Sequence, residues 1–193
     1  MKNIATTALW ISAGAFFYSN SAIAQAVPMA QAAESATATP LSGVRLAGQG
    51  VLRFLGFEIY RARLWVQPGF DADNYGAQPL ALELTYHRDF TAEAIAKRSL
   101  EEMRRVGSFT PQQATRWQQA LQAALPDVKS GDRLLGIHQP GVGAVFKMAG
   151  RVVGEVPDAE FSRLFFGIWL SPQTSEPGLR QELLAATRTA GQP

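Results

Sequence analysis

The two histidines, His87 and His138, are candidate general bases, and each stands at the end of a predicted strand. A serine on a G-x-S-x-G turn would give such a base a nucleophile to activate, but the sequence contains no such turn. It also contains no cysteine, which excludes disulfides, thiolate zinc sites, iron–sulfur clusters and cysteine nucleophiles. Two histidines are too few for a histidine-rich metal site. We therefore interpret both histidines as surface or hydrogen-bonded structural residues.

Two glycine pairs are candidate phosphate-binding turns. Gly48-Gln49-Gly50 begins a G-x-G pattern, but no third glycine and no helix follow at the spacing of a dinucleotide-binding fingerprint. Gly141-Val142-Gly143 lies between two predicted strands and is typical of a hairpin turn. Neither pair predicts a nucleotide cofactor.

Arg61 and Arg63 are two residues apart, so on a strand they point to the same face. Two neighbouring cations repel each other unless an acidic group lies nearby. Acidic side chains on an exposed face would supply that group, and so would a bound anion. The sequence leaves both interpretations open.

Glu101 and Glu102 are adjacent carboxylates that could act as an acid and a base. They are interleaved with Arg98, Arg104 and Arg105 on a predicted helix, at spacings that allow ion pairs along its surface. We interpret the two glutamates as a solvated salt-bridging surface rather than a catalytic pair.

The elements that must position these residues fall into blocks. Period-two patterns predict strands and 3.6-residue patterns predict helices. The predicted strands cover 51–55, 57–65, 80–87, 131–138, 142–148 and 151–156, and the predicted helices cover 91–107, 111–125, 161–170 and 177–187. Blocks of strands and helices, rather than strict alternation, predict an α+β fold with helices covering an antiparallel sheet.

Length and composition fit one packed domain. The chain has 193 residues, of which 47% are hydrophobic, so it can fill a core and is not wholly disordered. Its formal net charge is +2, without the basic cluster of a nucleic-acid-binding surface. Nucleic acid is therefore not an expected partner.

The N-terminus has the pattern of a secretory signal. Lys2 precedes a mostly apolar run, residues 4–17, and an A-x-A cleavage pattern ends at Ala24 or Ala26. We predict a signal peptide over residues 1–26 and export to the periplasm. No later stretch is apolar enough to predict a membrane span in the mature protein.

A segment rich in Ala, Thr, Ser and Gln follows, over residues 27–42. It lacks a periodic apolar pattern, which predicts a disordered linker. The folded domain is predicted over residues 43–190.

The order of motifs in this domain resembles that of the chalcone isomerase-like family, in its exported bacterial branch. The residues that carry the resemblance are Gly48-Gln49-Gly50 running into 57–65, Arg98–Met103 before Gly107, Lys129–Asp132, Pro140–Gly143 before Val145-Phe146, and Phe161–Pro172. The resemblance implies an open-faced β-sandwich, in which helices pack on one side of a large antiparallel sheet and a ligand cleft lies between them.

The plant enzymes of this family close a chalcone to a flavanone by intramolecular addition of a phenolate, without a cofactor. Their pattern has an arginine in the first strand, a threonine in the next, a tyrosine and an asparagine on the first helix, and a hydroxyl residue on the third. At or near the matching positions this sequence has Leu52 (followed by Arg53), Tyr60, Thr91, Arg98 and Gly167. All the matched positions depart from the pattern. Leu52 cannot polarise a ketone, and Arg53 would reach the cleft only through a β-bulge.

The family also contains non-catalytic members that bind fatty acids through an arginine and a tyrosine. The resemblance therefore implies a ligand site made of Arg53, Tyr60, Thr91 and Arg98, with no cofactor and no metal. We predict a non-catalytic binder of a small amphipathic carboxylate such as a fatty acid.

Three alternatives stay open. The chain could be a cofactor-free isomerase that acts on a flavonoid-like ligand. It could also be a structural or interaction module whose cleft is filled by its own side chains. Arg98 could pair with Glu102, one turn along its own helix, instead of with a ligand.

Overall fold

The computed structural model describes residues 41–188. The predicted signal peptide, 1–26, lies outside the described residues, as does the predicted linker apart from its last two positions.

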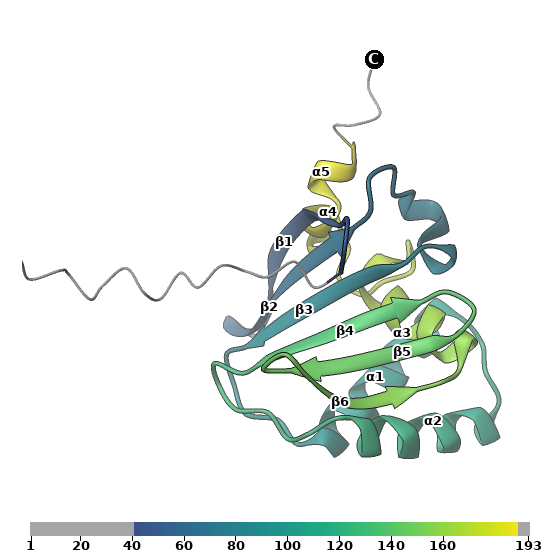
Figure 1. Ribbon diagram of the computed structural model, residues 1–193. Helices are drawn as coiled ribbons and strands as arrows, with labels where there is room; N and C mark the ends of the chain where they lie inside the picture. The colour runs from purple at the N-terminus through teal and green to yellow at the C-terminus, as the bar shows by residue number, and fades with distance from the viewer. Residues whose placement is uncertain (1–40, 189–193) are drawn as a thin grey trace, which may run out of the picture. The chain divides into compact units, whose positions relative to one another are not determined.

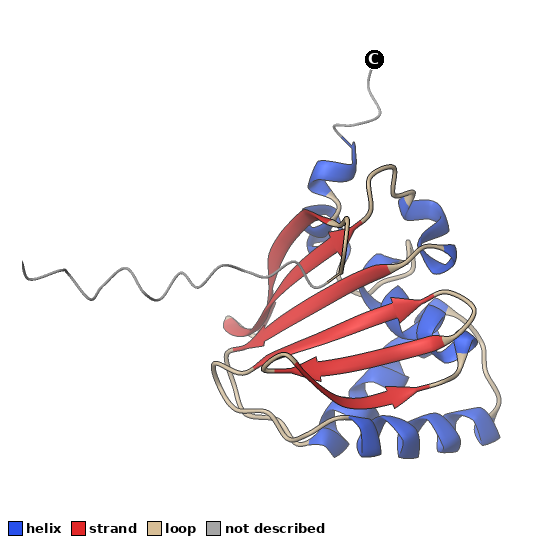
Figure 2. Ribbon diagram, in the orientation of Figure 1, coloured by secondary structure: helices blue, strands red, loops and turns tan. Residues whose placement is uncertain are grey.

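A six-stranded antiparallel sheet forms the framework, with each strand hydrogen-bonded to the next in sequence order (Figures 1 and 2). The strands are β1 (Arg45–Phe54), β2 (Phe57–Val66), β3 (Leu80–Tyr86), β4 (Arg133–Gln139), β5 (Gly143–Met148) and β6 (Arg151–Val156). Helices lie on one face of this sheet (Figure 2). The predicted α+β fold is confirmed.

The helices begin at side chains that satisfy free backbone N–H groups. Thr91 caps α1 (Ala92–Val106), and Thr110 forms a capping box with Gln113 at the start of α2 (Pro111–Ala124). Asp158 caps α3 (Ala159–Leu170). Each of these capping residues directly precedes an apolar helical repeat in the sequence.

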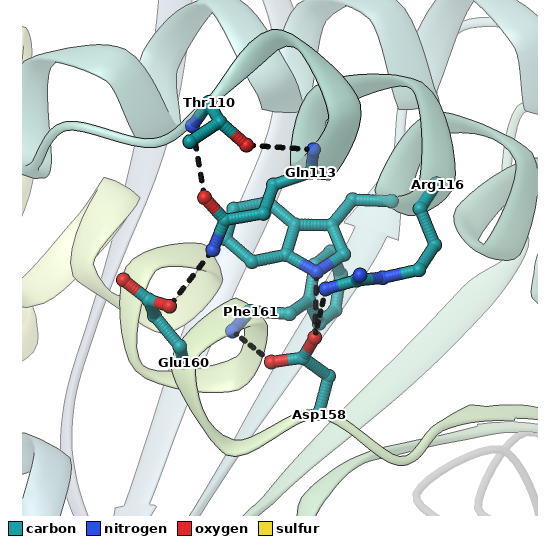
Figure 3. Close-up of polar contacts among 7 residues, drawn as sticks. Thr110, Gln113, Arg116, Asp158, Glu160 and Phe161 are labelled. Carbon is teal, nitrogen blue, oxygen red and sulfur yellow. Dashed lines mark hydrogen bonds and ion pairs between the residues drawn. The ribbon is translucent and has the colours of Figure 1, made fainter.

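Asp158 also ties α2 to α3 (Figure 3). Its carboxylate accepts hydrogen bonds from the Phe161 backbone N–H at 3.0 Å, from Trp117 Nε1 at 2.8 Å and from Arg116 Nη2 at 3.1 Å. Burial raises the pKa of Asp158, but these donors outweigh it and hold the pKa below its usual value. The ionised carboxylate therefore joins the two helices near neutral pH.

β1 begins six residues earlier than predicted. Its glycines lack side chains, and the C-terminal helices pack against the strand at these positions. A Cβ at Gly48 would overlap the carbonyl oxygen of Glu182, and one at Gly50 would lie 2.6 Å from Leu179 Cδ1. The glycines thus allow α4 (Pro177–Leu183) to pack directly on an extended strand.

Two further details differ from the prediction. The single helix expected over 177–187 is divided, because Leu184 leaves helical geometry between α4 and α5 (Ala185–Arg188). The loop after β2 contains a short 3-10 helix, η1 (Ala72–Ala77).

The opposite face of the sheet carries the arginine pair. Arg63 forms an ion pair with Glu83 on β3 at 3.5 Å, and its guanidinium lies over the Trp65 ring. Arg61 is exposed. The structure therefore favours an acidic side chain, rather than a bound anion, as the partner of this pair. Within residues 41–188, no helix is both long and apolar enough to cross a membrane.

A candidate ligand-binding cavity

A cavity of about 410 Å³ lies between the helical layer and the inner face of the sheet. Its walls come from β1 to β4, α1, α3, α4 and the connections beside them. The lining residues are mainly apolar and aromatic: Leu52, Phe54, Ile59, Tyr60, Leu84, Tyr86, Phe90, Ala94, Ile95, Arg98, Ser99, Glu102, Leu125, Leu134, Phe165, Ile168, Trp169, Ser175, Glu176 and Leu179. This size is within the range of small-molecule sites.

The floor of the cavity is formed by side chains that also belong to the core. Leu84 and Leu134 are paired across β3 and β4, and Phe165 and Trp169 of α3 pack above them. Phe165 and Trp169 lie four residues apart on the same side of α3, and both are buried in the core. Both also line the cavity, so they can contact a ligand as well as hold the fold together.

A β-bulge decides which residues of β2 face the cavity. Leu52 pairs with Tyr60 and Arg53 pairs with Glu58, so Ile59 is an extra residue on β2. Ile59 and Tyr60 consequently both line the cavity. The bulge does not bring in Arg53, which is exposed and donates to Glu58 Oε1 at 2.6 Å. The predicted residue Arg53 therefore lies outside the lining.

Two phenols are placed on one wall of the cavity. The rings of Tyr60 and Tyr86 meet edge to face, with centroids 6.1 Å apart. Trp169 Nε1 donates to the Tyr60 hydroxyl oxygen at 2.9 Å, which leaves the Tyr60 hydroxyl proton for another acceptor. Burial raises the pKa of Tyr60 and of Tyr86 above its usual value. Both phenols are therefore neutral hydrogen-bond donors at physiological pH.

The charged end of the cavity is on α1. The Arg98 side chain is 66% exposed and donates from Nη2 to Glu102 Oε1 at 2.6 Å, whereas the Glu102 side chain is 7% exposed. Arg105 Nε lies 3.4 Å from the other carboxylate oxygen of Glu102. The helix-surface pairing that the sequence left open for Arg98 is thus present.

This geometry corrects one interpretation of the sequence. Glu101 is exposed, as expected, but Glu102 is buried against the cavity. A buried carboxylate requires charged or hydrogen-bonding partners, and the two arginines supply them from the solvent side.

Two more of the matched positions lie outside the lining. Thr91 Oγ1 accepts the backbone N–H of Ala94 at 3.1 Å and serves as the N-cap of α1, while Ala94 itself lines the cavity. Gly167 lies within α3, where a Cβ would overlap Tyr75 Oη and lie 2.5 Å from Val106 Cγ1. Gly167 therefore serves close packing. Of the four predicted ligand-binding residues, the structure brings Tyr60 and Arg98 to the cavity.

Both histidines have partners that the sequence did not identify. His87 Nδ1 lies 2.9 Å from Glu58 Oε2. His138 is buried, with Nδ1 2.6 Å from Ser162 Oγ and Nε2 3.0 Å from the Gly76 carbonyl oxygen. Neither histidine lines the cavity. No group of three or more His, Asp or Glu side chains in the described part of the chain is arranged to hold a metal ion.

Comparisons with known proteins agree with this architecture. An Arabidopsis thaliana fatty-acid binding protein has a similar crystal structure, with a TM-score of 0.60 and 13% identity, over 79% of this chain and 92% of that one. An uncharacterised protein of Haemophilus influenzae is 26% identical over 153 residues, which are 79% of this chain and 74% of that protein. The profile described as chalcone isomerase-like matches residues 25–185. The chain therefore belongs to the chalcone isomerase-like family.

Proposed function

We propose that this protein is a non-catalytic binder of a small amphipathic carboxylate such as a fatty acid. The observation that carries the proposal is a cavity of about 410 Å³ with mainly apolar walls and a cation, Arg98, among its exposed lining residues. An acyl chain would occupy the apolar interior, and its carboxylate would lie at the mouth beside Arg98. The structurally similar Arabidopsis protein is a fatty-acid binding protein, which supports this ligand class.

Two polar side chains of the lining, Arg98 and Tyr60, have hydrogen-bond donors available for a ligand. Arg98 uses Nη1 and Nη2 toward Glu101 and Glu102, at 3.5 and 2.6 Å, and a guanidinium has further N–H groups for a ligand oxygen. Tyr60 has a hydroxyl proton that it can donate into the cavity. A cavity of this size also disfavours a module whose cleft is filled by its own side chains.

Substitution of Arg98 tests the site. Arg98→Ala should weaken binding of a fluorescent long-chain fatty acid about tenfold or more, since it removes a charge-assisted hydrogen bond. Arg105→Ala is the matched control, because Arg105 also pairs with Glu102 but does not line the cavity. Undiminished affinity in Arg98→Ala would exclude this carboxylate site.

A second variant tests whether the ligand enters this cavity at all. Ala94 is exposed and lines the mouth. Ala94→Trp should block the mouth and reduce binding without affecting the fold. Binding that persists unchanged would place the ligand elsewhere.

We also propose that the protein works in the periplasm after removal of its signal peptide. The support is the cation, apolar run and A-x-A order in residues 1–26. N-terminal sequencing of the periplasmic protein should begin at Gln25 or Val27. A terminus at Met1 or Lys2 in that fraction would contradict export with cleavage.

A further inference from the structure

The turn between β1 and β2 exposes three large apolar side chains. Phe54 is 62% exposed, Leu55 is 80% exposed and Phe57 is 57% exposed. We call residues 54–57 the hairpin tip. Neighbouring apolar side chains exposed to this degree usually mark a surface that is covered in function.

The fold itself does not require leucine at this turn. Leu55 and Gly56 have φ of 50° and 81°, so both central residues adopt left-handed conformations. Asparagine before glycine is favoured there, and bulky side chains are disfavoured. The β5–β6 turn has the same two signs of φ, at Ala149 and Gly150, with a small side chain. A bulky, exposed residue in a strained conformation points to a role outside the fold.

Charged side chains around the hairpin tip include more cations than anions. Arg53 pairs with Glu58, and His87 contacts the second oxygen of that carboxylate. Arg88 is exposed, and its guanidinium lies over the Phe57 ring at 4.3 Å from the centroid. Apolar side chains bordered by arginines match the interface of an anionic lipid bilayer.

Phe54 connects the hairpin tip with the cavity, since it is largely exposed and also lines the cavity. We propose that the hairpin tip docks on an anionic membrane and seats the cavity mouth at the lipid surface. An amphipathic ligand would then pass between bilayer and cavity without its acyl chain crossing water. The passage of ligand rests on the proposed function, whereas the docking does not.

Vesicle binding by the ligand-free chain tests the docking. Phosphatidylcholine–phosphatidylglycerol vesicles should co-sediment with the wild-type chain, and Leu55→Asn with Phe57→Ser should lower the partition coefficient about tenfold or more. Val142→Ser with Val152→Ser is the matched control, because these valines are also more than half exposed but lie at other turns and strands. Equal partitioning of the two double variants, or no binding by any chain, would overturn the proposal.

A local probe separates the hairpin tip from the apolar run at residues 4–17, which could itself bind lipid. The emission of Phe57→Trp should gain a component that brominated acyl chains quench, compared with wild type. No added quenching would overturn the proposal.

The thermal stability of a Leu55 variant tests whether this side chain is needed for the fold. Leu55→Asn should raise the thermal midpoint while it lowers vesicle binding, because asparagine suits the turn. A lowered midpoint would show that Leu55 stabilises the fold.

A dimer in sedimentation velocity that the tip variant loses, without vesicle binding, would assign the tip to self-association. Normal fatty-acid binding in solution without vesicle binding would end the docking proposal and leave the proposed function intact.

Discussion

At the scale of single residues, Glu102 shows how an environment can separate two adjacent glutamates. The four-residue spacing left its pairing with Arg98 open as one of two alternatives, and the structure contains that ion pair. It did not predict the burial, because the helical repeat does not reveal that a cavity adjoins this side of α1. The partner arginines remain in solvent, so the carboxylate depends on cations that cover it from outside.

Removal of both cations should therefore destabilise the fold. Arg98→Ala with Arg105→Ala leaves the Glu102 carboxylate buried without either guanidinium, which should lower the free energy of unfolding by about 2 kcal/mol. Glu102→Gln added to this double variant should restore most of the loss. Denaturant unfolding at pH 7 measures the three chains. A double variant as stable as wild type would refute the dependence of Glu102 on its arginines.

The buried His138 should make the free energy of unfolding depend on pH. Burial lowers the pKa of His138, although its hydrogen bond to the Gly76 carbonyl acts in the opposite direction. The unfolded chain then binds a proton near pH 6.5 while the folded chain does not. The contribution of neutral His138 to the free energy of unfolding should therefore be complete above pH 6.5. It should be lost progressively as the pH decreases from 6.5 toward the lower pKa of the folded state.

Urea unfolding between pH 7.5 and 4.5 measures this effect. His138→Gln keeps a polar side chain without an ionisable ring, so its stability should depend less on pH across this window. Equal pH dependence of the two proteins would show that His138 does not contribute.

At the scale of elements, the sequence predicted those whose signals are local. The starts of α1, α2 and α3 and the turn at 141–143 are determined by neighbouring residues, and the structure has them within two residues of their predicted positions. The bulge at Ile59 was not predicted, because it depends on pairing between strands. The early start of β1 depends on the helix α4, which is distant in the sequence and packs against the strand where the glycines leave room.

Substitution of Gly48 tests the packing of α4 on β1. Gly48→Ala should lower the free energy of unfolding by about 2 kcal/mol, because the new methyl group overlaps backbone atoms of Glu182 and Leu183. Gly178→Ala is the matched control within α4, where a Cβ meets no atom of the described residues within 4 Å. It should be neutral or stabilising, since alanine favours helix. Similar losses in both variants would argue against a packing role for Gly48.

At the scale of the whole molecule, the sequence predicted the family and the antiparallel sheet with its helices. It predicted the site only in part. Tyr60 and Arg98 reach the cavity, while Arg53 is turned outward and Thr91 caps a helix. The positions of these side chains follow from the bulge and from the approach of α1, which require the assembled fold.

The arrangement of the whole site also predicts poor catalysis of ring closure. Leu52 lines the cavity where the plant pattern has an arginine, and Gly167 offers no hydroxyl. The purified protein should cyclise chalcones no faster than the spontaneous reaction, since each missing oriented donor costs about a hundredfold in rate. An absorbance assay follows flavanone formation. Rapid, stereoselective product would favour the isomerase alternative.

The order of the strands has a consequence for folding kinetics. β1 to β3 and β4 to β6 are two meanders of neighbours, and the connection that joins them carries both α1 and α2. Local hairpins close quickly, so docking of β3 on β4 should be the late, rate-limiting event. Leu84 and Leu134 meet across that junction and form the cavity floor. A bound ligand would therefore bridge the two meanders and slow unfolding, while the folding rate stays unchanged because its site does not exist until the junction closes.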